Sequence, residues 1–413
     1  MAYDDTTFRR QSDDEADGDP AAYRNGFAAT DYRSRRRDLD PADGGARHTE
    51  PTADLALRAG DGHDRLGVHI GWEIVLLLGV AAIGYLLYRL DPASLKRPAL
   101  DTLLVAAAAI GLLTLGMGVT LRAGVPNLAI GPIALAAELH YAENGDLGLL
   151  KCALPALLIA AAGGLVVAVL ILALHVPGWA ATLGAGLGVI VYDQMRTVPV
   201  VVQGEYDPTD HAIYLFGGFA VLAVLGGLLG TAGTIRRWLG QMRPDGDAAV
   251  RRGGAAALPV IGSLVLSSVF ATVAGLLMAA QSVKAIVPAT GLEWTGIALG
   301  TALVAGTSAY GRRGGIFGTL LAVTGMTLFL DYSDRRNLDI ALFAIAAGAI
   351  GGGLIITRLV ETYGKQLPLT PLDAQESAAA STGSSWQPDI WEQAAAPPPR
   401  SERWDDGPWS GAR

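Results

Sequence analysis

The sequence predicts an all-α, polytopic membrane protein with about ten transmembrane helices and a disordered tail at each end. Only 17% of the residues are charged and 51% are hydrophobic, and most of the charge lies in the two tails. Between the tails, apolar runs such as residues 154–174 and 258–280 reach the roughly 20 residues that a helix needs to cross a bilayer. The central part of the chain is therefore expected to lie in a membrane.

The apolar segments include three that are short and rich in Gly and Pro, as in "GVPNLAIGP" and "GWAATLGAGLG". Backbone that is broken at membrane depth is tolerated only where protein or a water-filled cavity satisfies its polar groups. The third, fifth and eighth segments are therefore predicted to line a pathway. The ten expected segments are residues 71–89, 101–119, 125–140, 152–174, 178–193, 212–230, 258–280, 293–307, 314–330 and 338–357.

Three regions follow from this pattern. Residues 1–67 and 360–413 are polar and lack apolar periodicity, so both are expected to be disordered because they cannot bury enough surface to offset the entropy of ordering. Residues 68–359 form the expected transmembrane domain. Four tryptophans lie beside acidic residues in the C-terminal tail, which leaves open whether that tail docks onto a partner or is idle.

Arg and Lys in short loops predict the orientation, because such loops stay in the cytoplasm. Residues 232–257, between the sixth and seventh segments, carry the densest basic loop. Ten crossings then place both termini in the cytoplasm, in what is expected to be a bacterial plasma membrane. Two basic pairs, at 96–97 and 335–336, fall on the other side and are outweighed by this loop. The five basic residues of the loop are Arg236, Arg237, Arg243, Arg251 and Arg252.

The sequence offers no support for an enzyme, a metal centre or a cofactor. It lacks a phosphate-binding Gly-x-x-x-x-Gly-Lys-Ser/Thr loop, a His-Glu-x-x-His pair and a Gly-x-Ser-x-Gly turn. The net charge of -8 comes from the tails and does not indicate a nucleic-acid partner. The ionisable residues of the apolar region lie near expected segment ends, where they are predicted to reach the lipid interface: Glu73, Glu138, Lys151, Asp193 and Glu293.

Three stretches, in this order, resemble the permease family of ABC importers for simple sugars, nucleosides and branched-chain amino acids. The first is "LLTLGMGVTLRAGVPNLAIGPIALAAE" at 112–138, with Gly116, Met117, Gly124, Leu128 and Gly131 as its matching positions. The second is "DGDAAVRRGG" at 245–254, followed by "AGLLMAA" at 274–280. The third and most specific is "GLEWTGIALGTALVAGTSAYGRRGGIFGTLLA" at 291–322.

The chain departs from the sugar-permease pattern at a few positions. Asn127, Ala129 and Pro132 stand where Asp and Ser are usual, and the local pattern is closer to nucleoside-type members. Ala305 replaces a usual glycine. The resemblance thus implies a permease for a small polar solute, with sugar and nucleoside both open.

The resemblance implies four kinds of partner besides the lipid and the solute itself. Cytoplasmic ATPase subunits would dock on the basic loop, a second permease subunit would complete the pathway, and a solute-binding protein would deliver the solute from outside. The implied ATPase-coupling residues are Pro244, Asp245, Asp247, Ala248, Ala249, Arg251, Arg252 and Gly253. The candidate pathway residues are Asn127, Gly131, Tyr192, Asp193, Ser267, Ser268 and Thr272.

Two other hypotheses about the function remain open. An ion-coupled secondary transporter would need no ATPase and is expected to carry charged groups within its spans. A non-transporting membrane scaffold would act through its tails and would need no broken helices.

Overall fold

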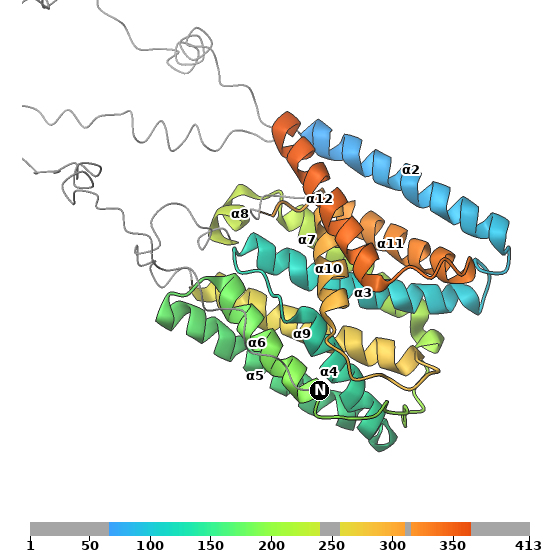
Figure 1. Cartoon of the computed structure of the whole chain (residues 1–413). Coiled ribbons are helices and arrows are strands. Elements are labelled where there is room, and N and C mark those ends of the chain that lie inside the picture. Colours follow the sequence, from blue (N-terminus) through green and yellow to red (C-terminus); the bar gives the residue numbers. More distant parts are fainter. Residues whose placement is uncertain (1–65, 240–256, 310–314, 365–413) are drawn as a thin grey trace, which may run out of the picture. The chain divides into compact units, whose positions relative to one another are not determined.

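The computed structural model describes residues 66–239, 257–309 and 315–364, which all belong to the unit of the chain that begins at Asp61 (Figure 1). These residues are almost entirely helical, and a single antiparallel bridge joins Val200 to Ile286. The helices are α2 (Leu66–Leu90), α3 (Ala99–Arg122), α4 (Ile130–Asn144), α5 (Leu149–Leu174), α6 (Gly178–Asp193), α7 (Ala212–Leu229), α8 (Gly233–Leu239), α9 (Ala257–Gln281), α10 (Leu292–Val304), α11 (Gly318–Arg335) and α12 (Leu342–Gly364), with short 3-10 turns η1 (Gly145–Leu147) and η2 (Pro208–His211).

Within the described ranges, six helices are long and apolar enough to cross a membrane: α2, α3, α5, α9, α12 and the continuous η2–α7 segment. This pattern fits a multi-pass membrane protein, as the composition predicts. Each of the ten expected segments falls on a helix, but α4, α6, α10 and α11 are shorter or less apolar than the others. The third segment, expected from residue 125, becomes helical only at Ile130, because Pro126 follows a turn at Gly124 whose φ is +77°.

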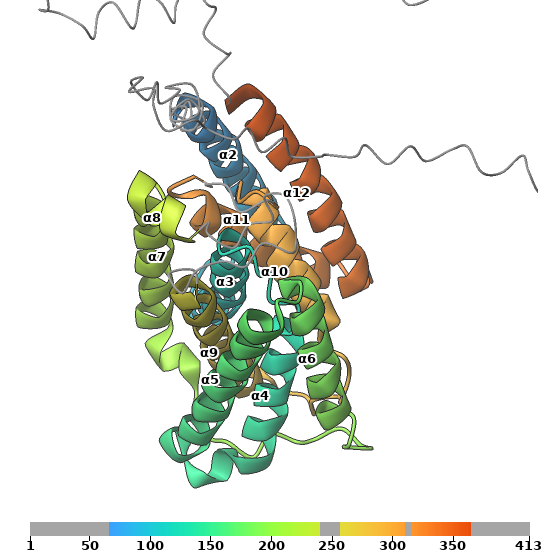
Figure 2. The same ribbon diagram turned by 90° about the vertical axis from the view of Figure 1, so that its left-hand side faces the viewer.

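Helices α3 and α9 pack against each other and against most of the remaining helices. Both views place α2 and α12 on one flank of this pair, and α5 and α6 on the opposite flank (Figures 1 and 2). Small residues let α9 approach its neighbours closely. A β-carbon on Gly275 would lie only 2.0 Å from the carbonyl oxygen of Ala134 in α4. The core at this contact is built from Leu, Ile, Met and Ala side chains of α3, α4, α9 and α10.

The first turns of α4 and α10 meet inside the bundle. A β-carbon on Gly131 would lie 2.0 Å from the carbonyl oxygen of Gly291, so only glycine fits there. The backbone N–H of Gly131 donates to Thr295 Oγ1 at 3.0 Å, and that hydroxyl donates to the carbonyl of Leu128 at 3.2 Å. Gly291 has φ of +66°, a conformation that a side chain would strain. The N-terminal ends of α4 and α10 are therefore in direct contact.

Helix α2 is attached to the rest of the bundle at one end by two polar contacts. Trp72 Nε1 donates to the carbonyl of Val304 at 2.9 Å. Glu73 Oε1 accepts from the backbone N–H groups of Phe317 and Gly318 at 2.7 and 3.2 Å. A carboxylate at a helix start is favoured because it pairs with free N–H groups and with the helix dipole. Glu73 thus caps α11, a role that the sequence analysis did not anticipate.

We predict that Gly275→Ala destabilises the bundle by about 1–3 kcal/mol, because the new methyl group must displace the α4 backbone. The matched control is Gly262→Ala in the same helix, where a β-carbon meets nothing within 4 Å. Thermal unfolding of the two detergent-purified variants measures the difference. Equal unfolding temperatures would contradict the close packing of α4 on α9.

Candidate translocation cavity

A cavity of about 440 Å³ lies between α4, α5, α6 and α9. Its volume is within the range of small-molecule sites in proteins. Most of its wall is made of Ala, Gly, Val, Ile and Leu side chains. The lining residue Ile159 of α5 is also 72% exposed, so the cavity reaches the surface along α5.

Among the residues that the structure describes, no Asp, Glu, Lys or Arg lines this cavity. Five side chains supply hydrogen-bonding groups: Asn127, His140, Tyr192, Ser268 and Thr272. Among them, the Thr272 hydroxyl donates to the Ser268 carbonyl at 3.0 Å, as hydroxyl groups within apolar helices commonly do. The wall therefore offers a few hydrogen-bonding side chains on an apolar background.

Asn127 lies in the turn between α3 and α4, where it is only 3% exposed. Its Oδ1 accepts from the N–H of Ala129 at 3.1 Å, and its Nδ2 donates to Ser267 Oγ at 3.0 Å. The Asn127 N–H donates to Thr120 Oγ1 at 3.2 Å. These bonds replace the helical hydrogen bonds that the break removes, which is the condition for non-helical backbone at membrane depth. Asn127 therefore both supports the break and faces the cavity.

The start of α6 is held against the same turn. Thr182 Oγ1 donates to the carbonyl of Pro126 at 2.7 Å. A β-carbon on Gly186 would lie 3.2 Å from the α-carbon of Ala129, which is tighter than most contacts of this kind. The close approach of α6 to the α3–α4 turn therefore depends on small residues in α6.

Tyr192 is fixed at the end of α6 by Arg196. The guanidinium lies 4.7 Å from the centre of the Tyr192 ring, and Nη2 donates to its hydroxyl at 3.1 Å. The same guanidinium donates to both carboxylate oxygens of Glu143, at 2.5 and 2.7 Å. Hydrogen bonding to Glu143 raises the pKa of Arg196 above its ordinary value, so this cation stays charged. Tyr192 is thereby held in one place at the cavity wall.

The structure brings together four of the seven candidate pathway residues, since Asn127, Tyr192, Ser268 and Thr272 line the cavity. Ser267 is absent from the lining but is hydrogen-bonded to Asn127. Gly131 contributes to the contact between α4 and α10 instead. Of the three short segments expected to line a pathway, α4 and α6 line this cavity, whereas α10 does not.

Two carboxylates are placed differently from the sequence expectation. Glu138 and Asp193 were predicted to reach the lipid interface, but Asp193 is 0% exposed and neither of its oxygens has a hydrogen-bond partner in the described residues. Glu138 Oε1 is also buried without such a partner. The expectation is wrong for Asp193 because α6 ends with this side chain buried inside the protein, and Glu138 lies in the middle of α4 and not at a helix end.

Sequence reasoning missed several lining residues, including His140, Gly163, Gly164 and Ala185. On α4, the lining positions 133, 136, 137 and 140 recur at helical spacing and therefore share one face of the helix. With Asn127 taken as a pathway residue, this spacing in the sequence could have predicted them. The eight implied ATPase-coupling residues, from Pro244 to Gly253, lie outside the residues that the structure describes.

No family model, curated protein or solved structure matches the chain. The cavity and the sequence patterns are therefore the basis for proposing a function.

We predict that the cavity is water-filled rather than lipid-filled. In a Cys152→Ala background, which removes the single cysteine, Ala185→Cys should react with a charged thiol reagent at least about tenfold faster than Leu187→Cys, because only a hydrated thiol ionises and reacts. Ala185 lines the cavity, whereas Leu187 of the same helix is exposed outside it. Equal slow rates, measured by mass spectrometry in lipid nanodiscs, would contradict the prediction.

Proposed function

We propose that the chain is the transmembrane permease subunit of an ABC-type importer, which forms the pathway for a small polar solute and is driven by a separate ATPase. The observation that carries the proposal is the cavity beside the α3–α4 break, with neutral polar groups in its wall. The resemblance of residues 112–138, 245–254 and 291–322 to this permease family supports it.

The chemistry of the wall favours an uncharged solute, a monosaccharide or a nucleoside. The side-chain oxygens of Asn127, Ser268 and Thr272 offer acceptors to the hydroxyl groups of a solute, and Tyr192 offers an aromatic ring with a polar edge. An amino acid would bring two charges into a wall that lacks a charged partner, and unpaired buried charges are costly. Branched-chain amino acids are therefore the less favoured of the family's solutes.

The proposed topology has ten crossings or partial crossings of a bacterial plasma membrane, with both termini in the cytoplasm. The basic segment 232–257 directly precedes α9. At the other end of α9, Gln281 Nε2 donates to the Thr102 carbonyl near the start of α3. In this topology, the loops around Val200 and Ile286 face outwards.

The proposed partners follow from the same geometry. A second permease subunit, identical or related, would cover the exposed side of α5 and close the cavity. Two ATPase subunits would act on residues 244–253, where Ala248 and Ala249 allow close docking and Arg251 and Arg252 can reach acidic groups. A solute-binding protein would deliver the solute to the outer face.

An ion-coupled secondary transporter is the second candidate. The observation in its favour is the pair of buried carboxylates, Glu138 and Asp193, because such groups mark ion or proton sites in carriers. In that case uptake would continue without an ATP-hydrolysing subunit and would be abolished by Glu138→Gln. A non-transporting scaffold that acts only through its tails would not require a polar cavity, so the cavity disfavours that hypothesis.

The test of the proposed function is co-purification with the cognate ATPase. Ala249→Glu or Gly253→Glu should reduce the amount of ATPase recovered by more than about tenfold, since an unpaired charge buried in an interface costs about 2 kcal/mol or more. Val201→Glu adds the same charge to an exposed position on the proposed outer face and serves as the control. An unchanged complex in all three variants would refute the coupling role of this segment.

A further inference from the structure

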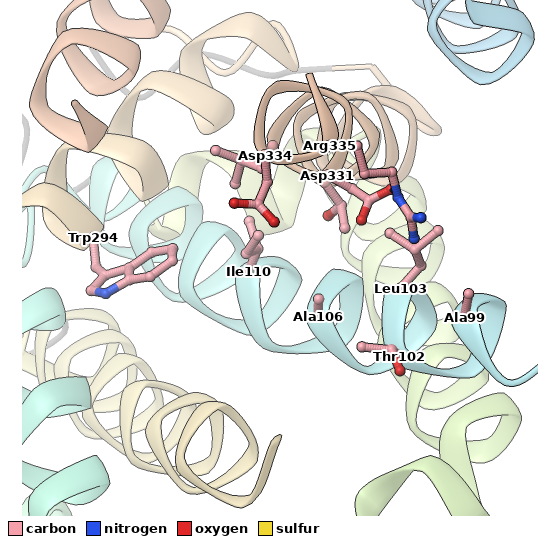
Figure 3. Close-up of a pocket in the computed structure, with 11 residues that line it drawn as sticks. Ala99, Thr102, Leu103, Ala106, Ile110, Trp294, Asp331, Asp334 and Arg335 are labelled. Carbon is pink, nitrogen blue, oxygen red and sulfur yellow. The ribbon is translucent and has the colours of Figure 1, made fainter. Parts of the chain in front are cut away.

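A second cavity, of about 430 Å³, lies between α3, α10 and α11 (Figure 3). It shares no lining residue with the first cavity. Thr102 of α3 lines it, and the carbonyl of Thr102 accepts from Gln281 at the end of α9. The second cavity therefore lies at the end of α9 opposite to the basic segment 232–257.

The charged groups of this cavity come from the last two turns of α11. Arg335 Nε donates to Asp331 at 2.7 Å, and Arg335 Nη1 contacts Asp91 at 2.7 Å. Asp334 also lines the cavity, and in the described parts of the chain its carboxylate takes part in no hydrogen bond or ion pair. Arg335 thus forms close ion pairs with Asp91 and Asp331 and interacts with Asp334 only electrostatically, so the exposed Asp334 carboxylate has no directly bonded cation among the described residues.

The opposite wall of the cavity is aromatic and apolar. The half-buried indole of Trp294 extends towards Ile110, while the carboxylates of Asp331 and Asp334 point towards α3 from the other side (Figure 3). An aromatic face attracts cations through its quadrupole, and a carboxylate attracts them through its charge. These two features lie on facing walls of one cavity.

We propose that the second cavity binds a small organic cation, whose ammonium or guanidinium group lies near Asp334 and whose apolar body lies against Trp294. An anion would meet the carboxylates of Asp331 and Asp334, with the Arg335 guanidinium already paired. This proposal does not depend on the importer function, since binding here requires no ATPase.

The test is isothermal titration calorimetry of phenethylammonium with the full-length, detergent-purified protein. The neutral 2-phenylethanol has the same apolar body and should bind much more weakly or not at all. Asp334→Asn should weaken phenethylammonium binding about fivefold, which is the upper range for an exposed ion pair. Asp334→Glu should retain most of the binding, and Trp294→Leu should weaken it about threefold.

The control variant is Asp210→Asn, which removes an exposed aspartate outside the cavity and should leave the affinity unchanged. Three results would overturn the proposal: no binding of phenethylammonium to the unmodified protein, equal binding of the neutral alcohol, or an unchanged affinity in Asp334→Asn. Binding of D-ribose in competition with phenethylammonium would also overturn it, because the cavity would then recognise hydroxyl groups.

Discussion

The need to satisfy backbone polar groups inside an apolar layer shapes the rest of this structure. The helical backbone is interrupted before α4 and again before α10. At these interruptions, neighbouring hydroxyl and amide side chains form hydrogen bonds with backbone groups that have no helical partner. Thr120 and Asn127 do this at the first break, and Thr295 connects the first break to the second. Gly131 and Gly291 allow the two helix starts to touch. Because the same turn also holds α6, the cavity is positioned by the bonds that make the break possible.

Much of the fold was predictable because long apolar runs have few alternatives in a membrane. The approximate positions of the helices followed from the apolar runs, and the Gly- and Pro-rich third and fifth segments line the cavity beside Asn127. The rotation of each helix did not follow from the apolar runs, since it depends on which neighbour each face meets. Gly131 was therefore expected at a pathway and lies at a helix contact, while His140 was overlooked although it lines the cavity. The burial of Asp193 was missed for a related reason, because a sequence does not show whether a helix ends at lipid or within protein.

The two cavities differ in the charged residues of their walls. The one beside Asn127 has no Asp, Glu, Lys or Arg among the described residues of its wall, which under the proposed function suits an uncharged solute. The one beside Asp334 has two carboxylates, one guanidinium and an indole, which suits a cation. The buried carboxylates of Glu138 and Asp193 belong to neither wall, and they are the main structural reason to keep a carrier mechanism as the second candidate.

In the proposed topology, the basic segment before α9 and the loop after it lie on opposite sides of the membrane, with the ATPase on the inner side. Labelling of intact cells with a membrane-impermeant maleimide tests this claim directly, using single cysteines in the Cys152→Ala background. The proposed topology predicts that Val283→Cys, in a fully exposed position after α9, is labelled from outside. It predicts that Ala249→Cys is labelled only after the cells are permeabilised. Labelling of Ala249→Cys in intact cells would contradict the orientation and with it the proposed ATPase coupling.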